Sequence, residues 1–492
     1  MSFFIPELYI LIMAGLFFVL SLAPDNPRRD FGLALFLSAG GLAICVGQAV
    51  CGEWAGSQQQ LLFSGTYQVD GFSQVFKCLI TIGFFLVISL CRKLPGIAEK
   101  RHSEFYLLLS VATLALMLLV SSVHLLTLYI ALELSSYSLY VLVYLRSGYE
   151  KGIEAAIKYF IIGATASAVM LFGFALLYGT GQSGYLSDLM RELPARMNEP
   201  VVLIGFILSF SGFFFKLALF PFHFWAPDAY EGAAHQVSAY IATVSKVAAI
   251  AVLLRLAALS GGSEKLAAFL IVLALASMTI GNLAAMVQKD LKRLLAFSSI
   301  AHAGYVMIAI LSMNVLGGTS AVFYAFSLLV MKFACFLVVV ETSVDGKNVE
   351  IDQLAGLHRR APLLALTLML AMFGLAGIPP VIGFTSKLLV FTAAVEAGYL
   401  FLVLLAMFNV VISLYYYLLV VKAAYFTEPE TEATPVSVSV PVKLLALALI
   451  LTMLIGGLYP HPFIELADSM AESLLQASGQ ASGQAFGQAF GP

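Results

Sequence analysis

Long apolar runs follow one another along most of the chain, and they restrict the fold more than any other feature. A helix needs about 20 mostly apolar residues to cross a bilayer. Of the 492 residues, 61% are hydrophobic and only 11% are charged. The runs predicted to span the membrane are 6–23, 31–50, 72–91, 104–119, 122–145, 157–178, 201–220, 237–259, 266–286, 294–312, 318–341, 363–396, 399–425 and 441–459. The sequence therefore predicts an all-α, polytopic membrane protein with about 14 transmembrane helices.

Positive charges are distributed unevenly between the two ends of these predicted helices. Loops after odd-numbered runs carry sixteen Lys and Arg residues, and the opposite ends carry five. Because positively charged loops stay in the cytoplasm, both termini are predicted to be periplasmic. The first run is expected to remain as an anchor, since the first positive charges, Arg28 and Arg29, follow it. The five opposite-side charges are Lys77, Arg191, Arg196, Arg255 and Lys265.

Motifs for bound cofactors are missing from the sequence. The five cysteines are scattered without the spacing of an iron–sulfur site. Only His302 lies well inside a span, whereas a haem held between helices normally needs two histidines. Neither a phosphate-binding loop nor a dinucleotide fingerprint occurs. We expect no metal, no cofactor and no nucleic acid to be bound by this chain.

Five lysines lie inside predicted spans, although a charge at the centre of a span costs roughly 2.5–3.5 kcal/mol. They are Lys158, Lys216, Lys246, Lys332 and Lys387. They are expected to face protein or water, with Glu133, midway along its span, as a counter-ion. Two interpretations stay open for Lys158 and Lys332, near span ends: a functional charge, or a side chain that reaches the interface. Glu154 lies on the same helix face as Lys158 and is either part of the site or only its partner.

Prolines are predicted to break two of the spans, the seventh and the twelfth. Pro221 follows Lys216 by five residues, and the pair Pro379 and Pro380 precedes Lys387 by about two turns. Irregular backbone at membrane depth survives only inside protein or beside a wet cavity. Paired broken helices are typical of repeats that form an ion pathway. The lysine precedes the proline in one segment and follows it in the other, so the sequence leaves open whether the two superpose.

A buried lysine can carry a proton if its surroundings change. Burial disfavours the charged amine, whereas an approaching carboxylate favours it. We therefore interpret Lys216 as an amine whose protonation depends on its distance from Glu133. His223 and His302 are candidate bridging groups, because imidazole titrates near neutral pH. A hydrogen bond at the helix end is the alternative for His223, and a core histidine with satisfied hydrogen bonds is the alternative for His302.

Three long segments resemble one protein family. They are "FPFHFWAPDAYEGA" (220–233), "KDLKRLLAFSSIAHAGY" (289–305) and "GLAGIPPVIGFTSK" (374–387). They are similar to the antiporter-like membrane subunits of respiratory complex I, the proton-translocating NADH–quinone oxidoreductase, and most similar to subunit N. The resemblance extends over nearly the whole chain, except for the low-complexity end.

The resemblance implies roles for the intramembrane charges. Glu133 and Lys216 form the pair of the first half-channel, Lys246 is the central connecting lysine, and Lys387 ends the second half-channel. Spans four to eight and nine to thirteen are then two inverted five-helix repeats. The implied segments are three N-terminal helices (1–100), the first repeat (101–260), the second repeat (261–426) and the last transmembrane helix (427–476). The tail (477–492) is predicted to be disordered because its low-complexity repeats cannot bury a core.

By the same resemblance, the chain is a proton-translocating subunit of the bacterial cytoplasmic (inner) membrane. FMN, iron–sulfur clusters and quinone lie in partner subunits. The expected neighbours are the lipid bilayer, an M-type antiporter-like subunit and small K- and J-type subunits. A subunit of a multisubunit cation/proton antiporter is the alternative, and a structural membrane scaffold is a third hypothesis.

Overall fold

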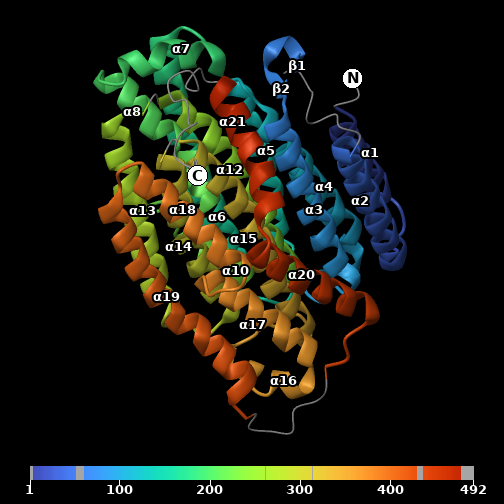
Figure 1. The fold of residues 1–492 in the computed structure, drawn as a ribbon. Coiled ribbons are helices and arrows are strands. Elements are labelled where there is room, and N and C mark those ends of the chain that lie inside the picture. Colours follow the sequence, from blue (N-terminus) through green and yellow to red (C-terminus); the bar gives the residue numbers. More distant parts are fainter. Residues whose placement is uncertain (1–3, 51–59, 261, 313, 429–435, 478–492) are drawn as a thin grey trace.

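The computed structural model describes residues 4–50, 60–260, 262–312, 314–428 and 436–477. These residues form a bundle of helices, with α1 and α2 at one edge and α19 at the opposite edge (Figure 1). A short antiparallel hairpin, β1 (Gln60–Leu62) and β2 (Tyr67–Val69), precedes α3. The predicted all-α membrane fold is confirmed.

The helices of the N-terminal half are α1 (Ile5–Ser21), α2 (Pro27–Val50), α3 (Gly71–Ser89), α4 (His102–Ser121), α5 (Leu125–Tyr144), α6 (Lys151–Gly181), α7 (Leu186–Arg196), α8 (Pro200–Ser209), α9 (Ser211–Leu217), α10 (Trp225–Gly232), α11 (His235–Ala242) and α12 (Val244–Ala257). Those of the C-terminal half are α13 (Glu264–Ala285), α14 (Leu291–Ser312), α15 (Val315–Thr342), α16 (Leu357–Arg360), α17 (Pro362–Ala376), α18 (Ile382–Glu396), α19 (Leu400–Phe426), α20 (Val440–Leu458) and α21 (His461–Ala477).

The described residues contain 12 helical stretches long and apolar enough to cross a membrane. Two of them join short helices, α8 with α9 and α11 with α12. The apolar helices α1 and α17 are shorter. The chain is thus a multi-pass membrane protein, and the predicted number of fourteen spans stays a prediction, as do the boundaries of the two repeats.

Both predicted helix breaks occur, and they have the same local geometry. α9 ends at Leu217, four residues before Pro221, and α17 ends at Ala376, four residues before Pro380. The next residue in each case, Ala218 or Gly377, has a positive φ, 63° or 84°. The residue after that donates its N–H to the carbonyl five positions back, at 2.8 Å in the first break and 2.9 Å in the second. This is the hydrogen bonding of a Schellman helix end. The two segments therefore correspond from the helix end to the proline, a match that the sequence left open, and they differ beyond it, where α10 begins at Trp225 and α18 at Ile382.

The eighth span is also interrupted, although the sequence predicts one continuous helix over 237–259. Thr243, with φ −117° and ψ −79°, separates α11 from α12. Lys246 follows in the first turn of α12. No proline or glycine marks this site in the sequence, so no local signal predicts the interruption.

The C-terminal segment differs from the expectation of a single last helix. The predicted span 441–459 corresponds to α20, but the chain continues as the 17-residue helix α21. α21 ends at Ala477, the first residue of the predicted disordered tail. The rest of that tail, 478–492, lies outside the described residues.

The charge pattern placed Lys77 among the charges at the opposite-side helix ends. The structure instead buries this lysine. Its amine lies 2.7 Å from Oε1 of Glu7, and both side chains are fully buried. The hydroxyl of Tyr67 in β2 also donates to Glu7, at 2.5 Å. α1 and the hairpin thus cover this part of α3, which the charge pattern alone did not reveal.

Replacing Asp70 with alanine is expected to destabilise the fold by about 3–5 kcal/mol, because it leaves a buried arginine without its partner. Nη2 of Arg255 donates to both carboxylate oxygens of Asp70 at 2.8 Å. Asp70 also accepts the N–H of Ser73 at the start of α3. Thermal unfolding of the detergent-solubilised protein measures the effect. Asp352→Ala, at an exposed position, serves as the control, and equal stability of the two variants would contradict the prediction.

Candidate functional site

The first group of buried charges lies where α9 meets α5. Lys216, in the last turn of α9, is only 2% exposed. Its amine donates to the hydroxyls of Ser135 and Ser136 on α5 at 2.6 and 3.3 Å. Glu133, on the same helix and half-buried, accepts a hydrogen bond from Ser167 of α6. Among the described residues, no ion pair within 4.0 Å joins Glu133 to Lys216. The predicted partners therefore lie on adjacent helices, α5 and α9, without an ion pair in this conformation, and two serines of α5 accept hydrogen bonds from the amine.

Lys246 reaches the same place from α12. Its amine donates to the carbonyl of Leu217 at 2.6 Å, and its side chain is buried. Leu217 is the last residue of α9, where carbonyls lose their intrahelical partners and carry partial negative charge. The break at Pro221 thus creates the acceptor that Lys246 uses. Because Leu217 adjoins Lys216, the two predicted lysines meet at one helix end.

Lys387 makes the corresponding contact at the second break. Its amine donates to the carbonyls of Leu375 and Ala376, both at 2.9 Å, at the end of α17. It also lies over the ring of Tyr305, 5.1 Å from the ring centre. Ala376 and Leu217 occupy the same position relative to their breaks. Each broken helix therefore ends in carbonyls that a buried lysine binds, although the two lysines come from different positions in the sequence.

Lys332 belongs to a chain of hydrogen bonds in the second half of the protein. Its amine donates to Ser298 at 2.7 Å, and the Ser298 and Tyr417 hydroxyls lie 2.5 Å apart. The Tyr417 hydroxyl lies 3.1 Å from Nε2 of His302, whose Nδ1 lies 2.7 Å from the hydroxyl of Tyr324. Lys332 is 1% exposed, so it does not reach the membrane interface. His302 has a partner on each ring nitrogen, as a core histidine would, and one of them, Tyr417, connects it through Ser298 to Lys332.

Replacing Tyr417 with phenylalanine is expected to slow proton translocation more than tenfold, because proton transfer along positioned groups contributes about 100-fold or more. The change removes one hydroxyl from between Ser298 and His302 and keeps the ring. The pumping rate of the assembled complex in sealed vesicles is the measurement. Tyr425→Phe, near the end of α19, is the matched control. A wild-type rate in the Tyr417 variant would exclude this chain of hydrogen bonds as a proton path.

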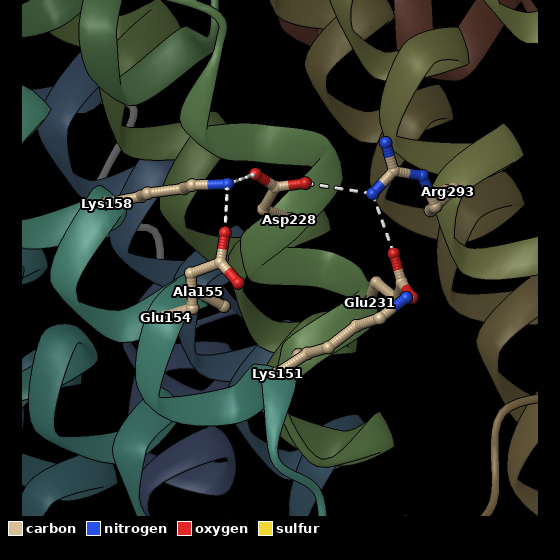
Figure 2. A pocket seen from close by; sticks show the side chains of 8 residues that line it. Lys151, Glu154, Ala155, Lys158, Asp228, Glu231 and Arg293 are labelled. Atoms are coloured by element: carbon tan, nitrogen blue, oxygen red, sulfur yellow. Dashed lines mark hydrogen bonds and ion pairs between the residues drawn. The ribbon is translucent and has the colours of Figure 1, made fainter.

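A charged crevice lies between α6, α10 and α14. It has a volume of about 150 Å³ and is lined by Lys151, Glu154, Ala155, Lys158, Asp228, Glu231, Gly232 and Arg293. Figure 2 shows Asp228 between Lys158 and Arg293. Its carboxylate oxygens lie 2.8 Å from Nζ of Lys158 and 2.8 Å from Nη1 of Arg293. Lys158 also pairs with Glu154 at 2.6 Å. Lys158 is 45% exposed here, so the predicted Glu154–Lys158 pair is part of a larger network that faces this crevice.

Glu231 completes that network on the α10 side. It pairs with Arg293 at 2.6 Å and with Lys151 at 3.1 Å. Burial raises the pKa of the Glu231 carboxyl, whereas the hydrogen bonds that it accepts lower the pKa and leave it below its usual value. Asp228, Glu231 and Arg293 were not predicted as site residues. The signal was present, since both acids belong to the quoted segment "FPFHFWAPDAYEGA".

Among the described residues, no hydrogen bond joins His223 to either lysine site. It follows the break, is buried, and its Nδ1 has no hydrogen-bond partner among the described residues. The structure thus places His223 beside the first broken helix without joining it to Lys216 or Lys246. Its role as a relay stays a prediction.

Comparisons with known proteins identify the family. The family described as "NADH:quinone oxidoreductase/Mrp antiporter, TM" matches residues 122–413. NADH-quinone oxidoreductase subunit N 2 of Syntrophobacter fumaroxidans is 56% identical over 470 residues, which cover 95% of this chain and 98% of that protein. This chain belongs to the subunit N family of NADH-quinone oxidoreductases. The resemblance inferred from the three sequence segments is therefore confirmed. As a subunit N, the chain is part of an enzyme complex.

Solved structures agree with membership of the subunit N family. A chain of respiratory complex I from Thermus thermophilus is 35% identical, with a TM-score of 0.80, and the match covers 94% of this chain and 99% of that one. A chain of the Mrp complex from a Dietzia species has a TM-score of 0.85 at 21% identity, over 97% and 99% of the two chains. The second match shows a shared fold alone. The complex I assignment is thus better supported than the antiporter alternative.

Proposed function

We propose that this chain translocates protons across the bacterial cytoplasmic membrane as a subunit of an NADH–quinone oxidoreductase. The observation that carries the proposal is the pair of equivalent helix ends, one bound by Lys246 and the other by Lys387. Both amines are buried at broken helices, where a structural charge would be costly and a protein-lined pathway is expected. Electron transfer takes place in other subunits and drives the changes here.

The proposed proton path runs from one buried lysine amine to the next. Lys216 receives a proton on the α5 side, where Ser135 and Ser136 hold its amine. When Glu133 approaches, it favours the charged form of Lys216, and when Glu133 withdraws, burial favours release. Lys246 accepts the proton at the shared end of α9, and Lys387 occupies the corresponding position in the second repeat. A charged amine binds the free carbonyls of a helix end more strongly than a neutral amine does. A change in the protonation of the lysine therefore changes how strongly it binds the helix end.

The expected surroundings of the subunit are part of the same proposal. FMN, iron–sulfur clusters and quinone are assigned to partner subunits, and this chain is proposed to hold no metal or cofactor. An M-type antiporter-like subunit and small K- and J-type subunits are the proposed neighbours. Both termini are proposed to be periplasmic, because the loops richest in Lys and Arg follow the odd-numbered spans.

Replacing Glu133 with alanine tests the proposal against its alternatives. The complex is assembled in proteoliposomes, and proton uptake is measured with NADH and quinone or with an imposed sodium gradient. The proposal predicts pumping with NADH and quinone alone, and its loss in Glu133→Ala with assembly retained. Glu192→Ala, at an exposed position on α7, is the control. Pumping driven by sodium would favour a cation/proton antiporter, and normal pumping in Glu133→Ala would favour a structural role for the charge.

A further inference from the structure

Helix α10 connects the end of α9 that carries Lys216 to the second half of the protein. Its first residue, Trp225, is buried, and its indole N–H donates to the carbonyl of Phe215 at 3.0 Å. Phe215 is the residue before Lys216. The indole ring also stacks on Tyr159 of α6, with ring centres 4.3 Å apart. The position of Trp225 therefore constrains the backbone beside Lys216.

Carbonyls at the other end of α10 bind three side chains from different segments. The carbonyls of a helix end lack intrahelical partners and attract positive charge. Those of Glu231 and Ala233 accept hydrogen bonds from the buried amine of Lys292, at 3.0 and 2.7 Å. The Glu231 carbonyl also accepts from Arg146 at 2.6 Å and from Asn348 at 3.1 Å. Lys292 on α14 and Asn348 after α15 belong to the second half of the protein.

The acidic side chains of α10 also bind α14. Nη1 of Arg293 lies 2.8 Å from a carboxylate oxygen of Asp228 and 2.6 Å from one of Glu231 (Figure 2). Lys158 and Lys151 of α6 pair with the same acids, but their side chains are 45% and 69% exposed, against 29% for Arg293. Ion pairs between exposed groups contribute little. Arg293 is therefore expected to hold α10 more firmly than either lysine does.

Helix α14 belongs to the second group of buried charges as well. Its Ser298 and His302 lie in the chain of hydrogen bonds that includes Lys332. Ser298 follows Arg293 by five residues in one continuous helix. Coupling between distant sites is carried by packed side chains, hydrogen bonds and rigid helices. α14 and α10 together form such a connection between Lys332 and Lys216.

We propose that Lys292 and Arg293 are positioning residues for Lys216, and that they act through α10 on the end of α9. Together with Asn348 they form what we name the α10 clamp. The clamp holds α10, and α10 holds the Phe215 carbonyl, so that the adjacent amine of Lys216 stays against the serines of α5. A displacement of about 1 Å near a reacting group can lower a rate about 100-fold. This role rests on the proposed proton transfer at Lys216 and adds the groups that set its geometry.

Amide hydrogen exchange in the assembled complex tests the connection independently of pumping. Arg293→Gln removes the charge that bridges the two acids of α10. We expect the amides of residues 216–219, at the end of α9, to exchange at least about tenfold faster in this variant than in the wild type. Trp225→Phe keeps a ring but removes the donor to the α9 carbonyl, so it is expected to have the same effect. Arg359→Gln, at a side chain that is 68% exposed, is the matched control.

Proton uptake per NADH oxidised tests whether the connection matters for transport. We expect Arg293→Gln and Trp225→Phe each to lower this yield at least about tenfold. The double variant is expected to lose no more than either single variant, because both changes release the same helix. Arg293→Lys keeps a positive charge and is expected to recover part of the yield.

Wild-type exchange at the end of α9 in Arg293→Gln and Trp225→Phe would overturn the proposal. Additive losses of pumping in the double variant would also overturn it, since they indicate two separate structural defects. If Arg293→Gln does not assemble, Trp225→Phe decides the question, and normal exchange in that variant would be sufficient to overturn the proposal. Faster exchange in the variants of a complex whose wild type does not pump with NADH would refute only the proposed function and leave the connection between α14 and α9 in place.

Discussion

Proton pumping is expected to fall by about 100-fold or more when Lys216 is replaced by alanine in the assembled complex. Lys216 lies between the two serines of α5 and the end of α9 that Lys246 binds. Alanine removes the proton-carrying group from that position and puts nothing in its place. Because electron transfer is proposed to take place in other subunits, NADH oxidation without a membrane potential is expected to fall less than pumping.

Proton uptake per NADH oxidised, in vesicles with and without an uncoupler, measures this prediction. Lys443→Ala is a suitable control because Lys443 is exposed at the start of α20. The assembled complex is quantified in each preparation, since a loss of assembly would imitate a loss of pumping. A fully assembled Lys216→Ala complex with a normal proton yield would remove Lys216 from the pathway.

Replacing Lys387 with methionine is expected to abolish pumping and also to weaken the fold. Methionine keeps much of the side-chain volume, but it leaves the carbonyls of Leu375 and Ala376 without the donor they have in the structure. A buried group left unsatisfied costs about 1–3 kcal/mol. The corresponding change at exposed Lys422 of α19 is expected to do neither.

Two measurements separate these effects of Lys387. The thermal unfolding temperature reports the loss of the hydrogen bonds, and the proton yield at low temperature reports the loss of the amine. We expect Lys387→Met to be deficient in both. A destabilised variant that still pumps normally would show that Lys387 is only a structural partner of the helix end.

The sequence predicted the elements whose causes are local. Apolar runs indicated the spans because the bilayer requires them, and Pro221 and Pro380 indicated the two breaks because proline cannot continue a helix. The position of Glu133 midway along a predicted span, and then the family resemblance, selected it as the partner of Lys216. In the structure the amine binds Ser135 and Ser136 instead, and Ser135 lies about 200° around the helix from Glu133. Sequence spacing alone could not choose between these positions.

The features that the sequence did not predict depend on contacts between distant segments. Lys246 binds a carbonyl 29 residues away that is free only because α9 ends there. Tyr417 meets His302 across 115 residues. α21 was missed for a different reason. Its polar face conceals it from a search for apolar runs, and only the structure shows that it packs on α15.

Substitution of Lys216 by arginine tests the central claim most directly. Arginine keeps the positive charge and a similar length, but its guanidinium does not release its proton in proteins. If Lys216 acts by gaining and losing a proton, the assembled Lys216→Arg complex should fail to pump, as Lys216→Ala does. A normal proton yield in Lys216→Arg would show that a permanent charge suffices there and would contradict the account.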